Sequence, residues 1–292
     1  MNDVSNSMIG IVTFNPEVEL FRRCIESAVS QSSLVTVVDN GSSNVGQIRE
    51  VCDKAGVRLV QLAQNRGVAA ALNQILKVAE ASRNSEVLLL DQDSILSPGS
   101  MSHLLETIAE PDVAIAVASV HERNTGNRQV GSSEINYCIT SGSLVRVATW
   151  LELGGYDESM FVDFVDFDFS ARIRVSGRRI VRDGRATLDH AIGESEQKRL
   201  GKIYNYSPFR LRHMAADMTY FSRKHRHTPR RLLPPRTSRV GVTAVLVRKA
   251  MLIALYEHNR RKKLMALARG AVEGSRTQMP NALANVGEAA QT

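Results

Sequence analysis

Two aspartates, Asp91 and Asp93, end an apolar run with only Gln92 between them, in the stretch VLLLDQDSIL. Carboxylate oxygens are the ligands that Mg²⁺ and Mn²⁺ prefer, and Mg²⁺ uses few protein ligands beside substrate phosphates. In such a pair the second carboxylate usually binds the metal, while the first can hold ribose hydroxyls. The spacing alone is common in unrelated proteins, so its place in the fold decides what it indicates.

A second acidic cluster lies in the stretch FVDFVDFDFSAR. It interleaves Asp163, Asp166 and Asp168 with four phenylalanines at positions 161, 164, 167 and 169. Carboxylates among aromatic rings lose hydration, which raises their pKa and makes them better general bases. Acidic residues also favour helix N-termini, where they complement the helix dipole. For Asp163 both interpretations stay open.

The first half of the chain alternates between apolar runs and helical patterns. The runs at 8–14, 34–40, 57–62 and 86–91 are separated by segments with apolar residues at helical spacing. This order predicts an α/β fold with parallel strands. Because the runs are continuously apolar, we expect strands that are buried on both faces.

Each predicted strand ends in polar residues. In a parallel sheet, ligands bind beyond the carboxyl ends of the strands. One such cluster alone is more typical of a turn or a helix cap, but four at one edge indicate a ligand site. The candidate residues are Thr13, Asn15, Asp39, Asn65, Arg66, Gly67, Asp91, Gln92 and Asp93.

Missing motifs exclude some classes of nucleotide-binding protein. No G-x-G-x-x-G follows the first strand and no G-x-x-x-x-G-K-[ST] occurs, which argues against dinucleotide oxidoreductases and P-loop hydrolases. A nucleotidyltransferase, which also places paired acids at a strand end, is an alternative. Such enzymes normally carry a glycine-rich basic loop after the first strand, whereas this chain has the acidic stretch TFNPEVEL there.

Composition favours a reducing compartment. The 292 residues are 43% hydrophobic, enough for a sizeable core, and no secretory signal precedes the first apolar run. The three cysteines, Cys24, Cys52 and Cys138, are widely spaced and odd in number. This pattern argues against a disulfide framework and against zinc, and fits the cytosol.

Charge is distributed unevenly. Residues 198–270 carry nineteen Lys and Arg against two acids, a net +17, which leaves −10 for the rest of a chain of net +7. Basic segments of this kind typically bind phosphate groups, on nucleic acid or on anionic lipid. A nucleic-acid module with stacking aromatics is therefore a second alternative. No nucleic-acid-binding signature supports it, and it would leave the acidic edge unexplained.

We expect a catalytic domain over 1–200, with a nucleotide-binding half at about 1–110 and an acceptor half at about 111–200. A basic helical region should follow over 201–292, with helices at about 201–226 and 240–270. Residues 240–256 are too short and too charged to span a bilayer. They suit a helix in the membrane interface; the alternative is packing on the same domain or on a second subunit.

The ordered motifs IVTFNP, VVDNGSSN, NRGVAAALN, DQDS and GGYDESMFVDFVDFDFSARIR resemble family 2 glycosyltransferases of the GT-A fold, from about residue 8 to about 227. The resemblance implies a Rossmann-like nucleotide-binding domain. It implies that Asp166, six residues before Arg172, is the catalytic base, and that the D-x-D motif binds metal and nucleotide. Asp39 matches the residue that reads the base, and Thr13 and Arg66 line the nucleotide pocket.

Further details resemble bacterial rhamnosyltransferases, which use dTDP-L-rhamnose to build cell-surface polysaccharide. The pointers are FVDFVDFDFSARIR, LDHAIGE and YSPFRLRHMAADMTYFSRKH. Asp168 departs from the pattern, because many relatives carry Glu there. The resemblance also makes His190 a candidate ligand of the metal or the diphosphate. For Trp150 we expect core packing in preference to a role as a sugar-stacking platform.

The resemblance implies an inverting, metal-dependent transferase that uses Mg²⁺ or Mn²⁺. Its expected partners are a nucleotide sugar, with dTDP-L-rhamnose favoured, and a saccharide or lipid-linked acceptor. We expect no nucleic-acid partner. The expected location is the cytoplasm, with peripheral contact at the inner face of the cell membrane; a homo-oligomer is the alternative for the basic tail.

Overall fold

The structure, a computed structural model, describes residues 6–122, 131–190, 196–198, 201–203 and 205–279. The chain forms two compact units, Met1–Glu158 with Val165–Ile192, and Ser159–Phe164 with Gly193–Thr292. It therefore leaves the first unit at Ser159 and returns at Val165. The boundary expected near residue 200 stays a prediction, and the sequence did not indicate the excursion at Ser159–Phe164.

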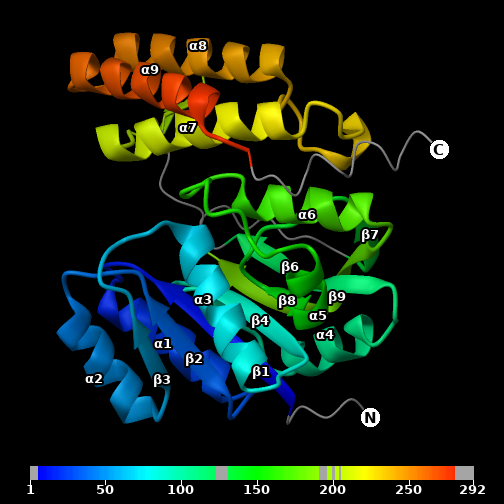
Figure 1. The fold of residues 1–292 in the computed structure, drawn as a ribbon. Coiled ribbons are helices and arrows are strands. Elements are labelled where there is room, and N and C mark those ends of the chain that lie inside the picture. The colour runs from blue at the N-terminus through cyan, green and yellow to red at the C-terminus, as the bar shows by residue number, and fades with distance from the viewer. Residues whose placement is uncertain (1–5, 123–130, 191–195, 199–200, 204, 280–292) are drawn as a thin grey trace. The chain divides into compact units, whose positions relative to one another are not determined.

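A mixed sheet with helices around it forms the first unit (Figure 1). Among the described residues it has nine strands in the order β3-β2-β1-β4-β8-β6-β9-β5, with β7 paired to β9. The strands are β1 (Ser7–Thr13), β2 (Val35–Asp39), β3 (Arg58–Gln61), β4 (Glu86–Asp91), β5 (Ile95–Leu96), β6 (Val113–Glu122), β7 (Ser133–Ile135), β8 (Ser143–Arg146) and β9 (Arg179–His190). The α/β fold class predicted from the sequence is confirmed.

The amino-terminal half of this sheet is parallel. β1 pairs in parallel with β2 and β4, and β2 with β3. β8 then runs antiparallel to both β4 and β6, while β6 and β9 are parallel. All polar strand ends of the parallel half therefore meet at one edge, as the sequence predicted.

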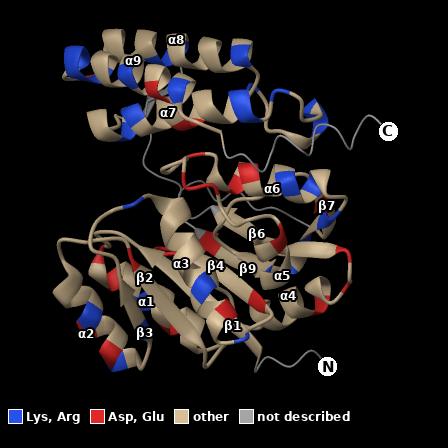
Figure 2. Cartoon of the chain, in the orientation of Figure 1, with Lys and Arg blue, Asp and Glu red and all other residues tan. Residues whose placement is uncertain are grey.

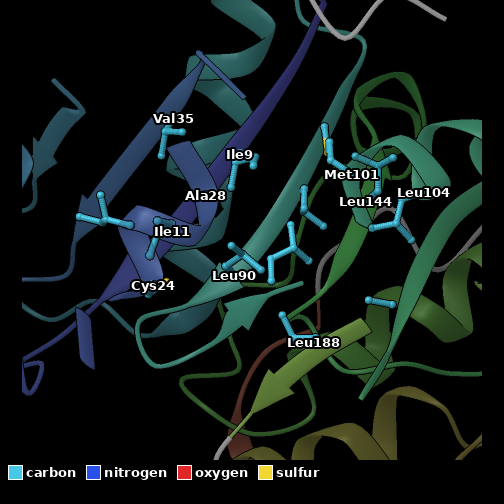
Figure 3. Close-up of a cluster of buried hydrophobic side chains, with 14 of the residues drawn as sticks. Ile9, Ile11, Cys24, Ala28, Val35, Leu90, Met101, Leu104, Leu144 and Leu188 are labelled. Atoms are coloured by element: carbon cyan, nitrogen blue, oxygen red, sulfur yellow. The ribbon is translucent and has the colours of Figure 1, made fainter. Parts of the chain in front are cut away.

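Helices cover both faces of the sheet because successive strand residues point to opposite faces. The helices of this unit are α1 (Val18–Val29), α2 (Val45–Ala55), α3 (Val68–Ala81), α4 (Ser100–Ile108), α5 (Val147–Glu152) and α6 (Val165–Val175). Ile9 and Ile11 of β1 join one core with residues of α1, α2 and α4 (Figure 3). Gly10, between them, faces Ile75 of α3 on the other side.

This core accounts for the apolar runs of the sequence. Phe21, Cys24, Ile25 and Ala28 of α1 are buried and follow helical spacing, so one face of α1 lies against the sheet. Full burial of a side chain such as Phe21 contributes about 1.5–3 kcal/mol. Each of the three cysteines is buried and free, as expected from their spacing.

The second unit contains three long helices: α7 (Pro208–Lys224), α8 (Arg239–Tyr256) and α9 (Arg260–Arg276). A short 3-10 helix, η2 (Arg230–Leu232), lies between α7 and α8, and β10 (Glu196–Lys198) pairs with β11 (Gly201–Ile203). Leu211, Ala215, Ile253 and Leu267 form the shared core of the three helices. Within the described ranges, no helix has the length and apolar run needed to cross a membrane.

The stretch expected as one helix over 240–270 is two helices. α8 ends at Tyr256, and Asn259 has a φ of 54°, which breaks the helical path. Glu257 at this break is buried, and its carboxylate accepts from Lys263 Nζ at 2.7 Å and from Lys249 Nζ at 3.4 Å. An acidic residue therefore fixes the turn between the two helices from inside the unit.

Two glycines allow α9 to approach α7 closely. A Cβ at Gly270 would overlap the carbonyl oxygen of Arg212, and one at Gly274 would overlap that of Ala216. Backbone carbonyls of a helix cannot move aside as a flexible side chain can. The α7–α9 contact therefore requires glycine at both positions.

We predict that Gly270→Ala lowers the stability of the second unit by about 1–3 kcal/mol, because α9 must move away from α7. Urea unfolding followed by circular dichroism measures the shift in midpoint. Gly46→Ala is the matched control, since its Cβ would meet nothing within 4 Å in α2, and alanine there should stabilise by up to about 1 kcal/mol. Equal midpoints for Gly270→Ala and wild type would contradict the close-packing argument.

Candidate active site

Strand register brings the polar strand ends together. Thr13 of β1 lies opposite Asp39 of β2, and Val12 lies opposite Asp91 of β4. Three predicted site residues thus stand side by side at the carboxyl edge. The predicted cluster at this edge is a property of the backbone pairing and does not depend on side-chain rotamers.

Gln92 joins the loops after β1 and β4. Its Oε1 accepts from Thr13 Oγ1 at 3.0 Å and from the Phe14 N–H at 2.7 Å. The side-chain amide of Gln92 therefore holds the two loops together. Asp91 and Asp93 lie on either side of Gln92 in the sequence.

Asp39 is fully buried. Its carboxylate accepts from the Ser42 N–H at 3.2 Å and from the Ser42 hydroxyl. The same Ser42 hydroxyl accepts from the Asn15 N–H at 2.8 Å, and Asn15 Oδ1 accepts from the Ser43 N–H at 2.8 Å. Asp39 thus anchors the loop in which Asn15 lies. Its contact with a nucleotide base stays a prediction.

Asn40 holds the loop that carries Asn65, Arg66 and Gly67. Its Nδ2 donates to Asn65 Oδ1 and to the Gly67 carbonyl, both at 3.1 Å, and its Oδ1 accepts from the Arg66 N–H at 3.0 Å. Three predicted residues are therefore brought together by a neighbour that the candidate set omitted. The adjacent Asp39-Asn40 pair in the sequence was the available signal.

The Arg66 side chain reaches Glu158, with Nη2 to Oε2 at 3.2 Å. Asn73 Nδ2 donates to Glu158 Oε1 at 3.0 Å, and Asn73 Oδ1 accepts from Trp150 Nε1 at 3.0 Å. Trp150 is buried, so the expected packing role is confirmed. Asn73 and Glu158 are members of this network that sequence analysis missed, since they lie 85 residues apart.

Asp91 and Asp93 are half-buried at the end of β4. The Asp91 N–H donates to Ser141 Oγ at 3.0 Å, and Ser94 Oγ lies 2.7 Å from the same hydroxyl. Burial raises the pKa of the Cys24 thiol above its usual range, and the carboxylates of Asp93 and Asp91 add to this shift. The charges of Asp91 and Asp93 therefore both affect Cys24 at the carboxyl end of the parallel strands.

The donor set suits a divalent ion that keeps part of its shell for phosphate and water. No group of three or more His, Cys, Asp or Glu with metal-binding geometry occurs among the described residues. Two carboxylates with oxygen donors are enough for Mg²⁺ or Mn²⁺ when substrate phosphates complete the shell. The residues present fit such an ion.

His190 closes β9, and its side chain lies outside the described part of the structure. Its backbone position is informative. Asp189 pairs with Ile95 in an antiparallel register. His190 itself pairs with Glu122 of β6, and the end of β9 lies beside β5, which begins two residues after Asp93.

Asp166 lies in the first turn of α6. It lines a small hollow in the first unit together with Cys138, Ile139, Thr140, Ser143, Tyr156, Phe169, Ser170 and Ile115. Burial raises the pKa of the Cys138 thiol to about 11, and the Asp166 charge contributes to that shift. The Asp166 carboxylate therefore lies at a hollow of about 10 Å³, and its role as catalytic base stays a prediction.

Asp168 has a structural role. It is fully buried, and Arg172 Nη2 and Nε lie 2.8 Å from its carboxylate. Arg172 also donates to the carbonyls of Leu153 and Gly155, at 2.8 and 2.7 Å. This ion pair fixes α6 to the Gly154-Gly155 turn, and thereby sets the direction of the first turn that carries Asp166.

Asp163 belongs to the second unit and precedes α6. It pairs with Arg210 of α7 at 2.9 Å, while burial raises its pKa. Asp217, also on α7, accepts from the N–H groups of Phe161, Val162 and Asp163 at 2.9–3.0 Å. The segment that leads into Asp166 is therefore held by two side chains of α7, Arg210 and Asp217. Sequence analysis did not single out Asp217.

Comparison with known proteins decides the family. The sequence profile of "Glycosyl transferase family 2" matches residues 8–183. The chain belongs to glycosyl transferase family 2. It is 25% identical over 245 residues to the "dTDP-rhamnosyl transferase RfbF" of Shigella flexneri, covering 77% of this chain and 82% of that relative.

A solved structure shares the fold of this glycosyltransferase. It is described as "GalNAc-T7 with UDP, GalNAc and Mn2+", with a TM-score of 0.55 and 12% sequence identity. The match covers 66% of this chain and 45% of the other, so the chain spans less than half of that protein's length. At this identity the likeness concerns the fold, and it agrees with the GT-A architecture predicted from the sequence.

Because its carboxylate is buried, Asp217 should make the stability of the protein depend on pH. Burial raises its pKa to about 6, although three backbone N–H groups oppose the shift. The folded protein therefore holds a proton that the unfolded chain releases near pH 4, so this stabilisation is full below about pH 4 and is lost as the pH rises through about 6. We expect the stability of wild type relative to Asp217→Asn to fall by about 2–3 kcal/mol from pH 4 to pH 7.

Urea unfolding midpoints across this pH range measure the difference. Asp53→Asn, which removes a carboxylate at an exposed position on α2, is the matched control. A pH-independent difference between wild type and Asp217→Asn would refute the raised pKa of Asp217.

Proposed function

We propose that this family 2 glycosyltransferase transfers L-rhamnose from dTDP-L-rhamnose, with inversion, to a saccharide or lipid-linked saccharide in cell-surface polysaccharide synthesis. One observation carries the shared site. Segment 138–143 borders both acidic positions: Ser141 Oγ accepts from the Asp91 N–H, and Cys138, Thr140 and Ser143 line a small hollow together with Asp166. A donor at the strand edge and an acceptor hydroxyl beside Asp166 would thus share one short segment.

The donor sugar is supported by the Shigella flexneri relative, whose name specifies dTDP-rhamnose. The nucleotide would occupy the carboxyl edge of the parallel strands. Asp91 would hold the ribose, Asp39 the base, and Thr13, Asn15, Gln92 and the Asn65-Arg66-Gly67 loop would line the nucleotide pocket. This arrangement follows the general rule for ligand sites in such sheets.

The chemistry assigned to the chain's own residues is general base catalysis. Asp166 accepts the proton of the acceptor hydroxyl as that oxygen attacks the anomeric carbon, and the nucleoside diphosphate leaves from the opposite face. Asp93, with His190, would hold Mg²⁺ or Mn²⁺. When bound, such an ion neutralises charge on the departing diphosphate. Asp168 and Arg172 keep α6 in the orientation that the base requires.

We also propose that the protein works in the cytoplasm and contacts the inner face of the cell membrane, where a lipid-linked acceptor would be accessible. The basic second unit supports this location. Its described helices carry Lys and Arg on many turns (Figure 2).

A donor panel tests the function. Purified protein is given UDP-, GDP- and dTDP-sugars, and the released nucleoside diphosphate is measured. We expect dTDP-L-rhamnose to be turned over fastest. Preference for a UDP-hexose would contradict the rhamnose assignment and leave a family 2 enzyme with another donor.

Asp166→Asn should lower kcat by about 10²–10⁴-fold, because the amide cannot take the acceptor proton. Donor binding, measured by calorimetry, should stay close to wild type, since the base acts on the acceptor. Asp53→Asn is the control and should keep full turnover. Retention of most of the turnover by Asp166→Asn would remove this residue from its proposed role.

Metal dependence is tested with chelation and Asp93→Ala. Wild-type activity should be lost in excess EDTA and recovered with Mg²⁺ or Mn²⁺. Asp93→Ala should recover little, with kcat lower by about 10²–10³-fold from weaker stabilisation of the leaving group. The metal dependence of dTDP binding provides a readout besides activity. Full wild-type turnover in EDTA would exclude the metal role.

A further inference from the structure

Helix α8 carries apolar residues around its whole circumference. Such a helix is normally buried on all sides. Only one side of α8 is covered: Val242, Leu252 and Ile253 are buried, and Leu246 and Ala250 pack on the core shared with α7 and α9. The opposite side is therefore an apolar surface that the described residues leave uncovered.

We call this surface the α8 stripe and define it as Val240, Ala244, Val247, Met251, Ala254 and Leu255. Their spacing of three and four residues places them on one side of the helix. Val240 is 80% exposed, Val247 62%, Met251 45% and Leu255 52%. Contiguous exposure of this kind marks an interaction site, whereas scattered exposed residues do not.

A basic pocket lies where the stripe begins. It has a volume of about 460 Å³ and is lined by Ser222, Arg226, His227, Arg230, Ser238, Arg239 and Val240. Val240 belongs to both the pocket and the stripe. Ser238 caps α8, and its Oγ accepts from the Gly241 N–H at 3.0 Å, so the positive end of the α8 dipole also faces this region.

Among the described side chains, the acids of this unit form contacts elsewhere and do not neutralise the pocket arginines. Asp163 pairs with Arg210, Glu257 with Lys263 and Lys249, and Glu273 with Arg212. Asp217 accepts backbone N–H groups. Among the side chains that the structure describes, none of Arg226, Arg230 and Arg239 forms an ion pair with a carboxylate.

We propose that the α8 stripe and the adjoining arginine pocket form a docking surface for an anionic lipid bilayer. The stripe enters the boundary between headgroups and acyl chains, and the pocket holds lipid phosphate. An apolar face bordered by basic side chains has the complementarity that interfacial helices use. A bilayer fits this surface better than a second copy of the chain, because anionic headgroups supply the counter-charge that the pocket arginines lack among the described side chains, whereas a second copy presents the same basic pocket. The inference deepens the proposed membrane location and is independent of the donor sugar.

Vesicle binding by the full-length protein tests the proposal. Vesicles of phosphatidylcholine, with or without phosphatidic acid, are sedimented with protein at low and high salt. We expect binding that requires phosphatidic acid and weakens at high salt. Arg230→Gln with Arg239→Gln should lower the partition coefficient by about 30-fold, because each arginine near an anionic surface strengthens binding by about fivefold.

Two matched controls separate the surface from general charge and general apolarity. Arg261→Gln with Lys262→Gln removes two exposed charges from α9, and Leu151→Gln with Val175→Gln removes two exposed apolar side chains from the first unit. Both should bind as wild type does. Val247→Gln with Met251→Gln should lower binding by about tenfold or more. All these positions are exposed, and an unchanged urea unfolding midpoint confirms that each variant is folded.

Three results would overturn the proposal. One is the absence of phosphatidic acid-dependent binding by wild type. Another is an equal loss of vesicle binding in the α9 control, Arg261→Gln with Lys262→Gln, which would show that net charge alone explains the effect. The third is dissociation of an oligomer by Val247→Gln with Met251→Gln, seen in analytical ultracentrifugation, with vesicle binding unchanged; the stripe would then be a contact between copies. Loss of sugar transfer with vesicle binding intact would instead count against the proposed function alone.

Discussion

The parallel register of β1 with β2 and β4 is the constraint on which the candidate site depends. It sets Thr13 opposite Asp39 and places Asp91 beside Val12, so three strand ends deliver polar groups to one edge. A shift by one residue would turn every side chain to the other face of the sheet. Ile9 and Ile11 would then leave the core that they share with α1 and α4, and Gly10 would no longer face Ile75. Core packing and site geometry are thus fixed by the same pairing.

Much of this could be predicted from the sequence because the signals are local. Continuous apolar runs predict strands, and the polar residues directly after them predict the ligand edge. The side-chain partners could not be predicted, because they join residues far apart in the chain. Gln92 lies 79 positions from Thr13, and Asn73 lies 85 from Glu158. The aspartates also differ in ways that spacing does not show, since Asp39 is buried against Ser42 whereas Asp91 and Asp93 are half-buried.

The acids of the second unit show that counting charges along the sequence predicts a charged surface but does not predict side-chain contacts. In the sequence they are a few acids in a basic stretch. In the structure, Glu257 is buried where α8 gives way to α9, and Asp217 is buried against backbone N–H groups. Neither contact produces a local pattern in the sequence. The sequence therefore predicted a single helix over 240–270 and not the turn at Glu257. Because these acids serve internal contacts, the positive charge of the unit remains largely at its surface.

The path of the chain gives the second unit a direct connection to the proposed base. On one side of Asp166, Glu158 is held in the first unit by Arg66 and Asn73. On the other side, Asp168 is held in that unit by Arg172. Between them, the segment Ser159–Phe164 belongs to the second unit, where Asp217 binds its backbone. Asp166 therefore follows, within three residues of Asp163, a segment that α7 stabilises. The helical unit contributes to the order of the turn that carries the proposed base through covalent continuity, whichever partner its outer surface binds.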